Sequence, residues 1–182
     1  MASTFYTIGH SNRSAEDFIA LLQAAGARGV ADVRAFPHSP SMPRFDGEAL
    51  AAQLAQRGLA YRHFPALGGR RPRSPGIDPQ LNARWDNRSF HQYADYATTA
   101  PFRAGLAELM DWHAGAPAAL MCAEAVWWRC HRRILTDYLL AAGCAVFHVL
   151  GPGAVKPAQA TPGIVTRDDG ALTYPRAAGD AP

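Results

Sequence analysis

AALMCAEAVWWRCHRRILTDYLLAAG, residues 118–143, is the stretch whose patterns decide the fold. Its first five residues are apolar, which predicts a buried strand over residues 118–122. A helix from about Trp128 to Ala142, ended by Gly143, is then predicted because apolar residues recur on one helical face. These residues are Ile134, Leu135, Tyr138, Leu139 and Ala142. A buried strand that leads into such a helix is typical of α/β proteins.

Short apolar runs and helical patterns alternate along the rest of the chain. Further strands are predicted over residues 5–8, 29–33, 59–64 and 145–150. Further helices are predicted over residues 14–26, 46–56, 89–98 and 101–113. The sequence IVTRDDGALTY, residues 164–174, predicts a hairpin around Asp169-Gly170. We therefore expect an α/β fold: one three-layer domain over residues 1–182, with a mainly parallel sheet of about five strands flanked by helices, plus the small C-terminal hairpin.

Two segments lack these patterns. Residues 65–88 are rich in Gly, Pro and Arg, and a loop of this length is typical of a lid, a binding loop or disorder. The tail over residues 176–182 is expected to be frayed.

Composition limits the classes of partner and location. The net charge of +3 does not require nucleic acid as a partner, although nucleic acid stays possible. Of the 18 basic residues only Lys156 is lysine; arginine suits bidentate binding of phosphate or carboxylate, and a compositional bias of the genome is the alternative explanation. The first residues do not show the pattern expected of a secretory leader. The sequence contains no apolar run of the roughly 20 residues that span a bilayer, and its three cysteines do not suggest a disulfide framework. We expect a cytoplasmic protein without a membrane partner; no pattern indicates its oligomeric state.

Polar residues follow three of the predicted strands at the point where each strand ends. They are GHSNRS at residues 9–14, DVR at residues 32–34 and CAE at residues 122–124. Right-handed crossovers place the carboxyl ends of parallel strands at one edge of the sheet, where α/β proteins bind their ligands. We therefore expect one hollow at this edge to contain His10, Arg34, Cys122 and Glu124.

The polar residues after the first two strands have structural as well as functional interpretations. Backbone N–H groups of residues 9–14 precede a helix and can bind an anion, or Ser11, Asn12 and Ser14 are ordinary turn and cap residues. Asp32 and Arg34 lie two residues apart and face one side of their strand. They form either a structural ion pair or an acid/base group beside an anion clamp.

The cysteines of the opening stretch have three interpretations. A thiolate near a helix start and arginines has a lowered pKa and can act as a nucleophile, with Glu124 or His131 carrying protons. Cys122, Cys130 and His131, together with Glu124 or His10, also form a sensible metal-ligand set, but the C-x7-C-H spacing matches no common zinc motif. The cysteines are otherwise small buried residues. We assign no metal site and leave the cofactor open.

Five motifs carry a family resemblance: TIGHSNR, ADVRAFPHSPSMPRF, LGGRR, MCAEAVWWRCHRRIL and GALTY. In these motifs, over roughly residues 4–174, the chain resembles the Domain of Unknown Function 488 family. The resemblance marks sixteen positions, most of which follow the predicted strands, and it implies no particular activity. They are His10, Ser11, Asn12, Arg13, Asp32, Arg34, Pro37, Phe45, Gly68, Gly69, Arg70, Cys122, Glu124, Cys130, His131 and Arg132.

Three functions fit these observations. The first is an enzyme that acts on an anionic small molecule such as a nucleotide or modified base. Its catalytic candidates are Cys122, Glu124, His131 and Asp32. Its ligand-binding candidates are His10, Ser11, Asn12, Arg13, Arg34, Arg70, Cys130 and Arg132. The alternatives are a nucleic-acid-binding or processing module that uses the arginines and aromatic residues of the long loop, and a ligand sensor without turnover.

Overall fold

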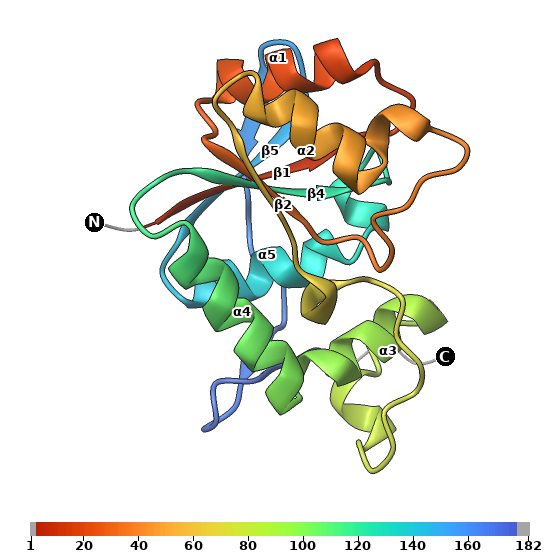
Figure 1. Cartoon of the computed structure of the whole chain (residues 1–182). Helices are drawn as coiled ribbons and strands as arrows, with labels where there is room; N and C mark the ends of the chain where they lie inside the picture. Colours follow the sequence, from red (N-terminus) through yellow and green to blue (C-terminus); the bar gives the residue numbers. More distant parts are fainter. Residues whose placement is uncertain (1–2, 178–182) are drawn as a thin grey trace.

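A six-stranded sheet forms the centre of the computed structural model, which describes residues 3–177 (Figure 1). The strand order is β3-β2-β4-β1-β5-β6. The first five strands in this order are parallel, and β6 runs antiparallel to β5. The strands are β1 (Thr4–Gly9), β2 (Gly29–Asp32), β3 (Ala60–His63), β4 (Ala118–Cys122), β5 (Ala145–Gly151) and β6 (Ala154–Pro157).

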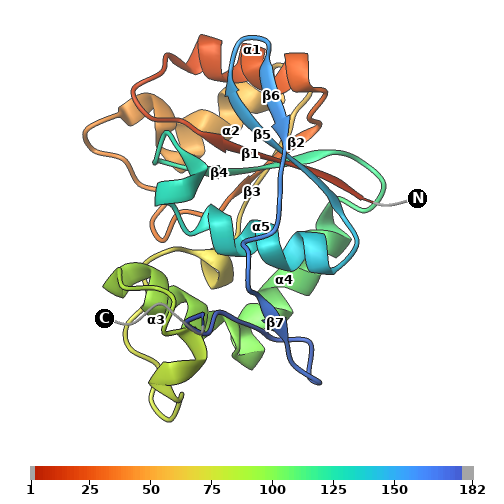
Figure 2. The same cartoon turned by 180° about the vertical axis from the view of Figure 1, so that it is seen from behind.

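Helices cover both faces of this sheet, as the two opposite views show (Figures 1 and 2). One face carries α1 (Ala15–Ala25) and α2 (Gly47–Ala55), and the other carries α3 (Arg88–Ala97), α4 (Ala100–Trp112) and α5 (Arg132–Ala141). A separate apolar core fills each interface, because alternate residues of a strand point to opposite faces. The predicted α/β fold with a mainly parallel sheet and flanking helices is confirmed.

The start and end of α1 follow the local signals in the sequence. The Ser14 side chain accepts a hydrogen bond from the backbone N–H of Asp17 at 3.0 Å, which caps the helix. Gly26 ends the helix with a φ of 83°, a left-handed conformation that glycine adopts without strain. These caps fix the point at which the chain leaves the carboxyl end of β1.

The helix predicted from Trp128 begins later, at Arg132, so that prediction is wrong at its start. Residues 127–129 form a 3₁₀ turn instead, and Cys130 after them is extended, with φ −131° and ψ 148°. The apolar periodicity that predicts the helix begins only at Ile134, so it carries no information about the preceding residues. Cys130 therefore lies in the connection and not on the inward face of the helix.

The structure adds order that the sequence patterns do not predict. The short strand β6 extends the sheet beyond the expected five strands. The loop over residues 65–88 contains 3₁₀ turns at Pro65–Leu67 and Pro79–Asn82, and the Tyr93 hydroxyl donates to the Leu67 carbonyl oxygen at 2.8 Å. This loop is thus tied to the helical layer rather than structureless.

The C-terminal segment contains the predicted hairpin. Its strands are β7 (Val165–Thr166) and β8 (Leu172–Thr173), which pair antiparallel on either side of Asp169-Gly170. The tail over residues 176–182 is expected to be frayed. Its first residue, Arg176, donates to Asp86 at 2.6 Å, and residues 178–182 lie outside the described residues. Over residues 3–177, no helix combines the length and the apolar character that crossing a membrane requires.

His148 of β5 is a buried histidine whose protonation opposes folding. It is 2% exposed, its ring stacks on Trp127 at 4.2 Å between centroids, and its Nδ1 forms a hydrogen bond with the Thr7 hydroxyl at 2.7 Å. Burial lowers the pKa of His148 to about 4, and the nearby positive charge of Arg132 adds to this effect.

We expect the free energy of unfolding to fall as the pH drops from about 6.5 to 4, because the unfolded chain binds the His148 proton first. Each tenfold difference in proton affinity corresponds to about 1.4 kcal/mol, so the loss from this group is about 3 kcal/mol. Urea denaturation at several pH values measures this loss. His148→Gln should flatten the pH dependence, and equal slopes for the two proteins would contradict the prediction.

Candidate functional site

A cavity of about 910 Å³ opens at the carboxyl edge of the sheet, where β1, β2 and β4 end. His10, Arg34, Cys122 and Glu124, which follow or end these three strands, all line it. We call it the strand-end cavity. Side chains from both faces of the sheet meet in it, since Arg34 extends toward the α1 and α2 side while Cys122 lies on the α5 side.

Asp32 and Arg34 form a buried bidentate ion pair below the strand-end cavity. The Arg34 Nε donates to Asp32 Oδ1 at 2.9 Å and its Nη2 donates to Oδ2 at 2.6 Å. The backbone N–H of Arg34 and the hydroxyl of Tyr61 also donate to the same carboxylate, at 3.1 and 2.7 Å. Although burial lowers the pKa of Arg34, the hydrogen bonds and charge of Asp32 raise it above its usual value.

Asp32 is 0% exposed and does not line the strand-end cavity. Both of its oxygens accept hydrogen bonds from groups that hold them in place. The same contacts fix the direction of the Arg34 guanidinium. The geometry thus favours the structural ion pair over the acid/base role for Asp32.

His10 is held as a neutral imidazole at the wall of the cavity. Its ring stacks on Phe45 with centroids 4.3 Å apart, and its Nδ1 lies 2.9 Å from the Ser11 carbonyl oxygen. Because that oxygen only accepts, Nδ1 carries the hydrogen, and Nε2 accepts from Arg34 Nη1 at 3.5 Å. Burial lowers the pKa of His10, and the charge of Arg34 lowers it further.

Cys122, Cys130 and His131 meet at a second wall of the cavity. Their ligand atoms all lie within 4.8 Å of one another. Cys122 ends β4, whereas the 3₁₀ turn over residues 127–129 returns the chain so that Cys130 and His131 lie opposite it, immediately before α5. Local sequence periodicity predicts the strand and the helix but not this return.

The ring of His131 is oriented by the end of β2. Its Nε2 lies 2.8 Å from the carbonyl oxygen of Val33, which can only accept, so this nitrogen carries the hydrogen. The other ring nitrogen, Nδ1, lies 3.5 Å from Cys130 Sγ. Arg132 Nε donates to the same sulfur at 3.3 Å, and its guanidinium also donates to the Glu124 carbonyl oxygen.

These contacts shift the pKa values of the two thiols in opposite directions. Burial raises the pKa of Cys130, but the hydrogen bond from the Cys122 thiol and the neighbouring His131 and Arg132 together lower it well below its usual value. The pKa of Cys122 is raised, first because its thiol donates to Cys130 and then by burial. Cys130, rather than Cys122, is therefore the more acidic thiol of the pair.

One protein-family model matches this chain. The model described as "Domain of unknown function DUF488" matches residues 14–139, more than half of the chain. The chain belongs to this family. Comparisons with curated proteins and with solved structures find no match.

The DUF488 match includes Asp32, Arg34, Cys122 and the Cys130-His131 pair, but it begins after the GHSNR motif and ends before GALTY. The predicted family is thus confirmed over a shorter range than residues 4–174. Both walls of the strand-end cavity come from this DUF488 region together with the end of β1.

The structure places the remaining predicted residues in two groups. Ser11, Asn12, Arg70, Cys130 and His131 line the strand-end cavity, inside or beside the DUF488 region. The two other predicted arginines do not line it. Arg13 donates to the carbonyl oxygens of Gly9 and Leu150, and Arg132 lies behind the cysteines.

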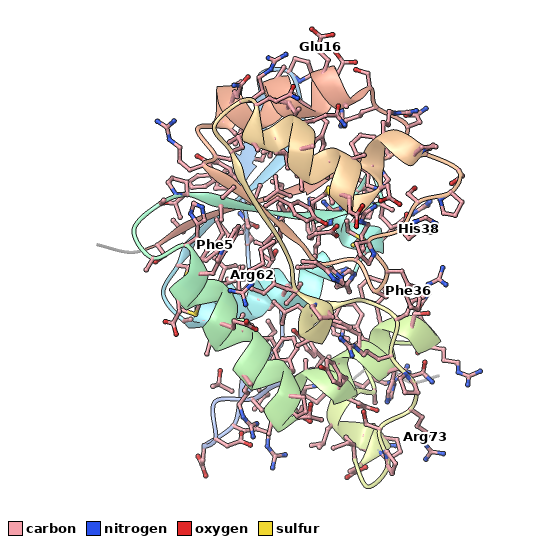
Figure 3. All side chains as sticks on the ribbon, in the orientation of Figure 1. Phe5, Glu16, Phe36, His38, Arg62 and Arg73 are labelled. Atoms are coloured by element: carbon pink, nitrogen blue, oxygen red, sulfur yellow. The ribbon has the colours of Figure 1, made fainter. Side chains whose placement is uncertain are left out.

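Several cavity residues are absent from the sequence-based prediction. Phe36, which is 66% exposed, and His38 lie on the loop after β2, and Figure 3 shows both at the edge of the molecule between α2 and α3. Arg129 also lines the cavity. Arg129 lies inside the stretch over residues 118–143, and Phe36 lies two residues after Arg34, so nearness to the strand ends is the signal that could have located them.

The glycines of the LGGRR motif let the long loop approach the cavity. A Cβ atom on Gly69 would lie 2.3 Å from Nδ1 of His131, and one on Gly68 would lie 2.8 Å from Cα of Ala35. Glycine is therefore required at both positions for this packing. The loop places Arg70 at the cavity while holding the His131 ring against the end of β2.

Proposed function

We propose that this protein is an enzyme that acts on an anionic small molecule, such as a nucleotide or a modified base, bound in the strand-end cavity. The observation that carries the proposal is the cavity itself. Its volume of about 910 Å³ lies within the roughly 300–1,000 Å³ of small-molecule sites, and it opens at the edge of a parallel sheet where ligands bind.

Uncompensated positive charge supports an anionic ligand. Arg70 and Arg129 are exposed at the cavity, and over residues 3–177 neither side chain has a recorded hydrogen bond or ion pair. Arg34 is already balanced by Asp32. Against these arginines the cavity wall has one carboxylate, that of Glu124. A phosphate or carboxylate group would therefore find two free guanidiniums there.

Aromatic side chains favour a ligand that also carries a flat ring. Phe36 is 66% exposed and Phe90 is half-buried, and both line the same cavity as the arginines. An aromatic ring exposed in a cavity offers a flat apolar face on which a heterocyclic base can stack. A base stacked on Phe36 with its phosphate on the arginines would use both features.

Glu124 is the best proton carrier in this arrangement. Its backbone carbonyl is held by Arg132, so the residue has a fixed position, while its side chain is exposed at the cavity. In the proposal Glu124 moves protons, Arg34 and His10 orient the substrate, and Asp32 positions Arg34.

We expect Arg129→Ala and Arg70→Ala each to weaken the binding of anions by about 10-fold or more, since a hydrogen bond to a charged group is worth about 1.5–3 kcal/mol. Both residues are exposed, so the free energy of unfolding should change by less than about 0.5 kcal/mol. Calorimetric titration with inorganic phosphate and nucleoside monophosphates measures the affinity.

Arg57→Ala removes an exposed arginine outside the cavity lining and is the matched control. Equal affinities for all three variants would exclude the arginines from binding.

Glu124→Gln should keep binding but slow the conversion of nucleotides or modified bases, followed by mass spectrometry, by about 100-fold or more. A ligand that binds and is never converted would instead indicate a sensor.

The nucleic-acid alternative has less support from the long loop. Arg71 stacks on Tyr96 at 3.9 Å and donates to the Gly68 carbonyl oxygen, so it is not free to bind phosphate. Trp85 stacks on Phe90 and packs against the core. Binding of DNA or RNA that falls steeply with salt would revive this alternative.

A further inference from the structure

We propose that Cys122, Cys130 and His131 bind a zinc-type metal ion, with a fourth coordination position open to the strand-end cavity. Two cysteines and one histidine are among the ligand sets of catalytic zinc, which keeps one position for water or substrate. The metal site is argued from the three side chains alone. Its part in turnover rests on the proposed function.

The spacing of the side chains fits a tetrahedral ion. Zinc lies about 2.3 Å from a cysteine sulfur and about 2.0 Å from a histidine nitrogen, so tetrahedral angles place these two ligand atoms about 3.5 Å apart. Cys130 Sγ and His131 Nδ1 are 3.5 Å apart. Cys122 offers its sulfur within the same 4.8 Å cluster.

The other hydrogen bonds of His131 and Cys130 are of the kind that hold metal ligands in position. A metal-binding histidine commonly donates its other ring N–H to a carbonyl oxygen, which orients the ring and leaves one lone pair for the ion. His131 donates from Nε2 to Val33 in this way, so Nδ1 is the free nitrogen. The N–H···S bond from Arg132 to Cys130 orients a thiolate in the same manner.

The charges around the cluster indicate which kind of ligand fits the fourth coordination position. The Arg132 guanidinium is 1% exposed, and among the residues that the structure describes it forms no ion pair with a carboxylate. Two thiolates neutralise a divalent ion, so the buried positive charge of Arg132 stays uncompensated. An anionic ligand at the fourth position, either hydroxide or a substrate oxygen, would balance it.

All three ligand residues line the strand-end cavity, so the fourth position faces the space where the substrate is proposed to bind. Glu124 lines the same cavity but is outside the ligand cluster. This separation leaves its carboxylate free to accept a proton from a water molecule held at the open coordination position. The sulfur-rich set favours zinc over magnesium or calcium.

The full-length protein tests the site by elemental analysis after purification and loading with zinc. We expect about one zinc per chain, and a fall of more than about 100-fold in zinc affinity for Cys122→Ala, Cys130→Ala and His131→Ala. Cys144→Ala is the matched control, because Cys144 is buried and free but lies outside the cluster. Unchanged zinc content in the three variants would overturn the proposal.

A second measurement needs no variant. Cobalt added to the metal-free protein should give thiolate-to-metal charge-transfer absorption, and zinc should protect Cys122 and Cys130, but not Cys144, from alkylation. The absence of both effects overturns the site, as does a Cys122–Cys130 disulfide that forms in place of metal binding. Zinc bound without any conversion of anionic compounds would overturn only the proposed function. Conversion by the metal-free protein would overturn only the part of the metal in turnover.

Discussion

Asp32→Ala is expected to lower the free energy of unfolding by about 3–5 kcal/mol, the largest loss that we predict for a single side chain. Among residues 3–177, the substitution removes the only carboxylate that pairs with Arg34, whose guanidinium is 6% exposed. A buried positive charge without its partner is far less stable than the intact pair. Urea denaturation followed by circular dichroism measures the change.

A second ion pair of the same length supplies the control. Arg176 and Asp86 are also 2.6 Å apart, but Asp86 is 81% exposed. Asp86→Ala should cost about 0–1 kcal/mol, since exposed pairs are screened by water. Losses of equal size for Asp32→Ala and Asp86→Ala would show that burial does not determine the effect.

Gly9→Ala is expected to cost about 3 kcal/mol and to disturb the strand-end cavity. A Cβ atom on Gly9 would lie 1.9 Å from the Glu124 carbonyl oxygen and 2.8 Å from Cα of Ala125. These are backbone atoms, so no side-chain rotation relieves the overlap. The connection after β4 must move away from β1, where His10 and Ser11 donate to the carbonyl oxygens of Cys122 and Ala123.

Denaturation measures the stability of this variant, and titration with inorganic phosphate measures the state of its cavity. Gly151→Ala is the control, because no atom beyond its two chain neighbours lies within 4 Å of the position of its Cβ and its φ is not in the left-handed region. Its effect should stay below about 1 kcal/mol. Equal effects at the two glycines would mean that the β1–β4 approach tolerates a side chain.

Local patterns in the sequence were sufficient for the five parallel strands and the presence of the flanking helices, but not for β6 or for the start of α5. The apolar runs at residues 5–8 and 118–122 and the Ser14 and Gly26 caps predict elements that the structure contains, because periodicity and capping depend on near neighbours in the chain. The sequence also predicted the sheet edge where polar residues gather, because right-handed crossovers place the carboxyl ends of parallel strands at the same edge.

Only the tertiary structure decided the partner of each polar group. Asp32 accepts from Tyr61, 29 residues away, and His131 donates to Val33, 98 residues away. Such contacts depend on how the layers pack and leave no periodic trace in the chain. The sequence by itself determined the α/β architecture and the sheet edge at which the polar residues gather. The fold determined that Asp32 pairs with Arg34 and Tyr61, and that the connection after β4 brings Cys130 and His131 back to Cys122.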